Sequence, residues 1–95
     1  MSNGFEWDAE KARTNQLKHR VDFALAVEIF EGPRLEVPDT REVYGEDRYI
    51  SVGEVAGRCL VVVHAPRDGK TRIISARKAT KHEQALYYRE IYGEE

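Results

Sequence analysis

The chain has 95 residues, of which 41% are hydrophobic and 34% charged, with a formal net charge of −2. This length allows one modest core and excludes a second domain, and the apolar content argues against wholesale disorder. A lone cysteine, Cys59, excludes an internal disulfide and a cysteine-based zinc site. We therefore expect a single domain over residues 1–95, with residues 1–4 disordered.

Two further features bear on where the protein acts. The chain shows no basic-then-apolar leader, and its longest strongly apolar run, Leu60 to Val63, is too short to span a membrane. A cytoplasmic protein without a membrane partner is the expectation.

Charge is distributed unevenly along the chain. The segment from Lys11 to Arg20 has four basic residues and His19, and no acid. The segment from Glu28 to Glu54 has eight acids and three arginines. The segment from His64 to Arg89 has seven basic residues and two acids. Two basic blocks thus flank an acidic one, which the small net charge conceals.

The first third of the chain predicts one short strand and two helices. FEWD, residues 5–8, is a candidate aromatic strand, and Asp8 is a suitable N-cap for a helix to about Leu17. Asp22 caps a second helix, FALAVEIFE, whose apolar residues recur at helical spacing. The dipeptide at 32–33, Gly-Pro, ends that helix.

A meander of strands follows. LEV, residues 35–37, is a candidate edge strand between two prolines, and Asp39 to Asp47 is an exposed loop. RYISVGEV, RCLVVVHA and TRIISARKA then predict three strands, joined by tight hairpins at Ala56-Gly57 and Asp68-Gly69.

A final helix is predicted by a capping box, with Thr80 at the N-cap and Glu83 three residues later, and it should end near Tyr92 before Gly93. The fold class is therefore α+β: two N-terminal helices, an antiparallel sheet of about four strands and a C-terminal helix. We expect the helices to cover one face of the sheet and leave the other open.

The basic strand RIISARK suggests a site for an anion. Strand alternation predicts that Ile73, Ser75 and Arg77 share one face and that Arg72 and Lys78 lie on the other. Arginine binds phosphate through two parallel hydrogen bonds, and an imidazole or lysine can transfer the proton. Such a set could cleave RNA without a metal by attack of the 2′-OH on phosphorus. The alternative is a set of solvated charges paired with the acidic block.

As a set, these residues resemble the BrnT toxins of bacterial type II toxin-antitoxin systems. The resemblance runs from FEWD through LKHRVDFALAVEIFEGP, GEDRYISVG and LVVVHAPRDGKTRIISARKAT to the terminal helix, and so covers nearly the whole chain. It implies a RelE-like fold, a ribonuclease that inhibits translation, and a cognate antitoxin. That antitoxin would be BrnA-like, with a ribbon-helix-helix part, so that DNA is contacted only indirectly through it. From the chemistry of the charged residues we expect no cofactor and no metal.

The family pattern also implies roles for individual residues. The implied catalytic residues are Arg77 and Arg48 for transition-state charge, with His19 or Lys18 for proton transfer. The implied RNA-binding residues are Arg67, Arg72 and Lys78. The family usually has KHGV where this chain has Arg20 in place of the glycine, which adds a phosphate contact or changes the turn that presents His19.

Two other functions remain open from the sequence. One is a non-catalytic module of the same fold that binds RNA or the antitoxin through the same charges. The other is an inactive relative that persists as an antitoxin-binding scaffold.

Overall fold

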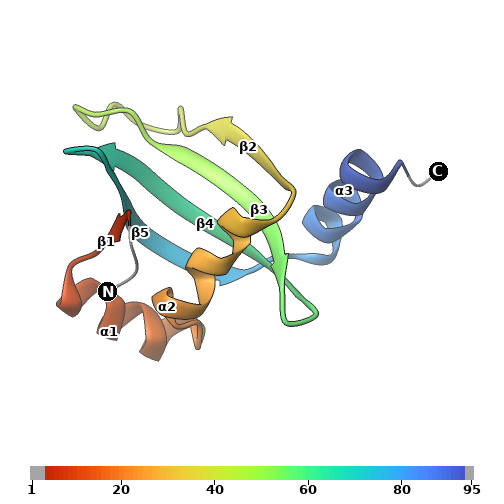
Figure 1. The fold of residues 1–95 in the computed structure, drawn as a ribbon, viewed down its shortest axis with the longest axis horizontal. Coiled ribbons are helices and arrows are strands. Elements are labelled where there is room, and N and C mark those ends of the chain that lie inside the picture. Colours follow the sequence, from red (N-terminus) through yellow and green to blue (C-terminus); the bar gives the residue numbers. More distant parts are fainter. Residues whose placement is uncertain (1–3, 94–95) are drawn as a thin grey trace.

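The computed structural model describes residues 4–93 and has one five-stranded sheet in the order β1-β5-β4-β3-β2 (Figure 1). The strands are β1 (Phe5–Glu6), β2 (Arg34–Pro38), β3 (Tyr49–Val55), β4 (Arg58–Arg67) and β5 (Lys70–Lys78). The α+β class is confirmed. The sheet has one strand more than expected and is mixed, because β1 pairs parallel to β5 while the other pairs are antiparallel.

The chain is hydrogen-bonded to β5 already at Gly4, the first residue that the structure describes. The carbonyl of Gly4 accepts a hydrogen bond of 2.8 Å from the N–H of Thr71. Residues 1–3, for which disorder was also predicted, lie outside the described part of the chain. Within residues 4–93, no helix is both long enough and apolar enough to cross a membrane.

The helices begin where the caps predict. Helix α1 (Ala9–His19) is capped by Asp8, whose Oδ1 accepts the N–H of Glu10 at 2.8 Å. The second predicted helix divides into α2 (Phe23–Ala26), capped by Asp22, and a 3₁₀ segment, η1 (Val27–Glu31). Tight 3₁₀ turns are common at helix C-termini. Helix α3 (Lys81–Tyr92) has the predicted capping box, and Gly93 ends it in the left-handed conformation.

The main core lies between one sheet face and the first two helices with η1. Its largest buried members include Phe23, Ile29, Leu60 and Ile73. The approach of η1 is so close that a Cβ on Gly53 would lie 2.8 Å from the Cβ of Ile29. Glycine at this position therefore permits the contact between η1 and β3.

Helix α3 does not join the other helices, so the prediction that all helices cover one face is wrong. Buried Tyr87 of α3 belongs to a separate cluster with Cys59 and Val61, which alternate along β4 with the main-core residues Leu60 and Val62. The hydroxyl of Tyr87 also donates to the carbonyl of Pro33 at 3.0 Å. Helix α3 thus covers one end of the opposite face.

The predicted faces of β5 also need correction, because a bulge interrupts the strand. The register passes from Val63↔Ser75 to His64↔Ile73, which leaves Ile74 as an extra residue. Ile73 and Ala76 are consequently both buried in the main core. Ser75 and Arg77 alternate with Ala76 and lie on the opposite face, so Ile73 and Arg77 do not share a face.

Local turn chemistry was predicted correctly. Ala56 and Gly57 have φ of 53° and 77°, and Asp68 and Gly69 have φ of 53° and 78°, which are the positive values that two-residue hairpins require. The acidic segment after β2 is a loop, as predicted, and β2 is an edge strand.

An unpredicted polar contact closes the open edge of β5. The buried side chain of Asn15 accepts from the N–H of Ala76 at 3.1 Å and donates to the carbonyl of the same residue at 2.9 Å. It also donates to the carbonyl of Val21 at 3.1 Å. One amide side chain in α1 thereby replaces a missing strand partner.

Candidate active site

Arg77 projects from the end of β5 toward the N-terminus of α3. Its Nη1 and Nη2 each donate to one carboxylate oxygen of Glu83 at 2.8 Å, and Nη1 also reaches the carbonyl of Lys78 at 3.1 Å. This two-pronged pair raises the pKa of Arg77 and, together with the N–H of Thr80, lowers the pKa of Glu83 to about 2. The geometry is the one that arginine adopts with a phosphate group.

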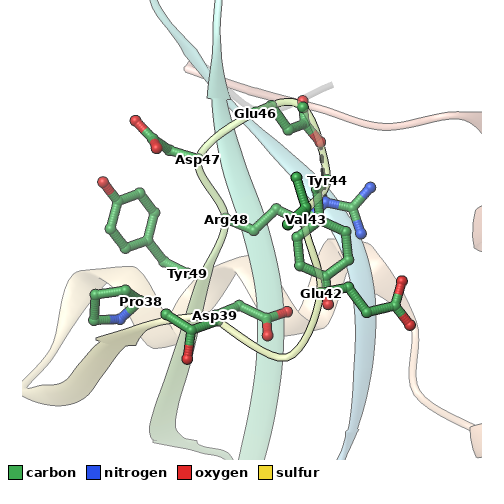
Figure 2. A pocket seen from close by; sticks show the side chains of 11 residues that line it. Pro38, Asp39, Glu42, Val43, Tyr44, Glu46, Asp47, Arg48 and Tyr49 are labelled. Carbon is green, nitrogen blue, oxygen red and sulfur yellow. Dashed lines mark hydrogen bonds and ion pairs between the residues drawn. The ribbon is translucent and has the colours of Figure 1, made fainter.

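Arg48 lies at the end of the loop between β2 and β3 (Figure 2). Its Nε is 3.0 Å from Oε2 of Glu46, and its guanidinium lies 4.1 Å from the centre of the Tyr44 ring. Residues 38–40 and 42–49 line a cavity of about 640 Å³ here. Figure 2 shows Arg48 and Tyr49 pointing in opposite directions.

The opposite directions of the Arg48 and Tyr49 side chains indicate which face of the sheet Arg48 occupies. Tyr49 is paired with His64 and stacks on its ring, on the face that carries η1. Alternation then assigns Arg48 to the opposite face, which is the face of Arg77. The charge of Arg41, in the same loop, opposes the rise in the pKa of Arg77.

The loop that carries Arg48 is closed by a buried carboxylate. The side chain of Asp39 is fully buried and accepts from Nε and Nη2 of Arg41, both at 2.7 Å. These hydrogen bonds hold the pKa of Asp39 far below its usual range. The N–H of Asp39 also donates to the carbonyl of Arg48 at 2.8 Å, which fixes the backbone where Arg48 enters β3.

Lys18 and His19 lie elsewhere, at the end of α1 beside the edge of β5. They line a cavity of about 270 Å³ with Ile74 and Ser75. The next residue, Arg20, has φ 59° and ψ 31°, a left-handed conformation that ends the helix. Arg20 thus adopts, at the end of the helix, a backbone conformation that glycine adopts more readily.

The remaining predicted residues lie on the β4–β5 hairpin. Arg72 is 3.5 Å from Glu6 in an ion pair, whereas Arg67 and Lys78 are exposed at strand ends. The structure therefore brings Arg48 and Arg77 to one sheet face and places Lys18 and His19 at the sheet edge. The cavities lined by Arg48 and by His19 share no lining residue.

A second polar cluster, on the other face, was not predicted from the sequence. The Oγ of Ser51 donates to Oε1 of Glu36 at 2.8 Å and lies 2.8 Å from Nε2 of His64, and Nε of Arg34 donates to the same carboxylate oxygen at 3.1 Å. These residues come from β2, β3 and β4. The register that brings them together depends on pairing between residues far apart in the sequence. Within β3, the local signal for this cluster is Ser51, a polar residue between apolar Ile50 and Val52.

A comparison with protein families finds one family model that matches most of the chain. The family model described as ribonuclease toxin, BrnT, of type II toxin-antitoxin system matches residues 7–83. A search of curated proteins gave no match. The matched region contains both arginines of the shared sheet face, the Lys18-His19 pair and the basic strand β5. The chain therefore belongs to the BrnT family of ribonuclease toxins of type II toxin-antitoxin systems.

Proposed function

We propose that the protein is a metal-independent endoribonuclease that cleaves RNA in the cytoplasm by attack of the 2′-OH on the adjacent phosphorus and so inhibits translation. The observation that supports this most is the position of Arg48 and Arg77 on one sheet face, each held by a carboxylate. A phosphate group can take the place of either carboxylate and gain the same hydrogen bonds.

In this proposal the arginines act on the transition state. Negative charge grows on the phosphorane oxygens as the 2′ oxygen attacks, and preoriented guanidinium groups stabilise that charge. The Glu83 carboxylate holds the Arg77 guanidinium in one orientation before RNA arrives. Arg77 is therefore presented to the substrate with little further loss of side-chain freedom.

Proton transfer and RNA binding are assigned to the remaining predicted residues. His19 or Lys18 takes or returns the proton, at the edge of β5 next to Ser75 on the arginine face. Arg67, Arg72 and Lys78 hold the RNA backbone along the same hairpin. An RNA strand that crosses the β5 edge would contact both groups.

The test is cleavage of RNA by the purified chain in EDTA. Arg77→Ala and Arg48→Ala should each reduce the cleavage rate by about 10²-fold or more, the scale observed when one donor to a developing oxyanion is removed. Arg89→Ala is the matched control, because Arg89 is an exposed arginine paired with Glu90 on α3. Cleavage that is absent from the wild-type chain, or unchanged in Arg77→Ala, would contradict the proposal.

A non-catalytic module that binds RNA or the antitoxin is the second candidate. It is favoured by the ion pairs of Arg48, Arg72 and Arg77, because each of these charges is already balanced within the chain. Binding that weakens steeply with salt while the RNA stays intact would identify this function.

A type II toxin has an antitoxin partner, and we propose a BrnA-like, ribbon-helix-helix protein in that role. Such a partner would cover the face of Arg48 and Arg77 with carboxylates, which compete with RNA for the same guanidinium groups. The double variant Arg48→Ala/Arg77→Ala should then lose affinity for the antitoxin. Full retention of affinity would place the antitoxin on another surface.

A further inference from the structure

A small cavity opens beside the cluster of Glu36, Ser51 and His64, on the sheet face opposite Arg48 and Arg77. It measures about 200 Å³, which is room for one planar base, and it is lined by Phe30, Arg34, Glu36, Tyr49, His64, Pro66 and Thr71. The lining combines the rings of Phe30, Tyr49 and His64 with a carboxylate and a guanidinium. This mixture is typical of pockets that bind a planar, polar ligand.

The carboxylate of Glu36 is held in a fixed position. Buried His64 lies 2.8 Å from the hydroxyl of Ser51, which donates to Glu36, and Arg34 donates to the same oxygen. Burial, which the Arg34 charge reinforces and Glu36 opposes, lowers the pKa of His64, so the imidazole is neutral at pH 7 and its Nε2–H donates to Ser51. His64 and Ser51 are thus positioning residues for Glu36.

Glu36 also has hydrogen-bonding capacity to spare. Burial raises the pKa of Glu36, but the hydrogen bonds from Ser51 and Arg34 and the positive charge of Arg34 outweigh this and lower it below the ordinary value. An ionised carboxylate accepts about four hydrogen bonds, and within residues 4–93 Oε1 accepts two while Oε2 has no hydrogen bond. The Glu36 side chain is 38% exposed and lines the cavity.

Among the nucleobases, guanine has the pattern of donors and acceptors that matches a carboxylate beside a guanidinium. Guanine presents two neighbouring N–H donors, at N1 and N2, beside the acceptor O6. A carboxylate accepts from both donors, and an adjacent guanidinium donates to O6. Adenine and cytosine each place a lone pair next to their amino group, which a carboxylate repels, and uracil offers a single donor between two acceptors.

We propose that this cavity binds a guanine base of the RNA substrate, with Glu36 accepting from N1–H and N2–H₂, Arg34 donating to O6 and Tyr49 stacking on the ring. The inference rests on the proposed function for RNA as the substrate. Tyr49 directly follows Arg48 in the chain, so the base pocket and the arginine face meet where β3 begins. The bound guanine would set which phosphodiester reaches Arg48 and Arg77.

The experiment measures binding of the four nucleoside 5′-monophosphates to the purified chain by NMR titration. Binding of GMP at least tenfold tighter than that of AMP, CMP or UMP is expected, with the largest backbone shifts at Tyr49, Ser51 and Glu36. Glu36→Gln should abolish the preference, because its amide presents a donor to N1–H or N2–H₂. Equal affinities for the four nucleotides in the wild-type chain would overturn the proposal.

Glu46→Gln is the matched control, because Glu46 is an arginine-paired carboxylate of nearly equal exposure, 36% against 38% for Glu36. It should leave the ratio of affinities unchanged, and a loss of preference in this variant would also overturn the assignment. Tyr49→Leu provides a second variant at the cavity, and it should weaken GMP binding at least tenfold while the far-UV spectrum remains native.

Failure of this proposal can be separated from failure of the nuclease. A chain that cleaves RNA but binds the four nucleotides equally lacks the guanine pocket and retains the activity. A chain that prefers GMP but leaves RNA intact has the pocket without the activity. Repeating the titration on Arg77→Ala should give the wild-type preference, since Arg77 lies on the opposite face.

Discussion

The two faces of the sheet differ in how they use charge. The face under α1, α2 and η1 is a continuous apolar core that ends in one polar cluster around His64. The opposite face carries a smaller apolar cluster under α3, and it also carries Arg48 and Arg77, each paired with a carboxylate. One face therefore provides most of the stability, while the other holds cations that a ligand can reach.

This division has a physical cause in β5. The bulge at Ile74 turns both Ile73 and Ala76 into the main core and leaves Ser75 and Arg77 on the other side. Without the extra residue, an apolar side chain and an arginine would share a face. The bulge thus lets a strand with four basic residues contribute to the core.

The largest effect is expected from breaking the polar contact that closes the core at the β5 edge. Asn15→Leu removes three hydrogen bonds and leaves the N–H and carbonyl of Ala76 buried without a partner. We expect a loss of about 3 kcal/mol in the free energy of unfolding, measured by urea denaturation. Gln16→Leu, at the neighbouring exposed position, is the control and should stay within about 0.5 kcal/mol of wild type.

The next effect concerns the close approach of η1 to the same face. Gly53→Ala places a methyl group 2.8 Å from the Cβ of Ile29 and should cost about 1–3 kcal/mol in thermal or urea unfolding. Gly32→Ala is the matched control, because Gly32 has no atom within 4 Å of its virtual Cβ and an extended backbone. Equal stability of the two variants would show that η1 can move away without cost.

Features set by neighbouring residues could be predicted from the sequence, and those set by distant ones could not. The caps at Asp8, Asp22 and Thr80 and the two hairpins depend on a few adjacent residues, so their signals are local. The bulge at Ile74 and the bridge from Asn15 to Ala76 depend on contacts across the sheet. The same holds for the candidate site. The sequence predicts Glu83 as a capping residue of α3, but its ion pair with Arg77 depends on the angle between β5 and α3.

On the arginine face, the Arg77–Glu83 pair predicts a dependence of stability on pH. Hydrogen bonds from Arg77 lower the pKa of Glu83 from 4.5 to about 2, so the native state binds this proton more weakly than the unfolded state. The contribution is complete above pH 4.5 and is lost as the pH falls toward 2. Because both side chains are partly exposed, we expect about 1 kcal/mol.

The measurement compares wild type with Glu83→Gln in urea denaturation between pH 2 and pH 7. The difference in the free energy of unfolding between the two proteins should be present at pH 7 and shrink as Glu83 is protonated. Titration of Asp39, whose pKa is also lowered, occurs in both proteins and cancels in the difference. A difference that does not change with pH would mean that the pair adds nothing to stability.

The smallest effect is expected at Arg20, between the two faces, where α1 ends beside the β5 edge. Arg20 occupies a left-handed conformation with φ 59°, and its N–H donates to the carbonyl of Gln16 at 2.9 Å. Arg20→Gly removes the clash of Cβ with the backbone but adds freedom to the unfolded chain, so the net gain should be about 0.5 kcal/mol in urea denaturation. Gln16→Gly, inside the helix, should instead lose about 1 kcal/mol, because glycine there gains no conformational relief. A loss of stability in Arg20→Gly would show that the arginine side chain contributes more at this edge than its backbone conformation costs.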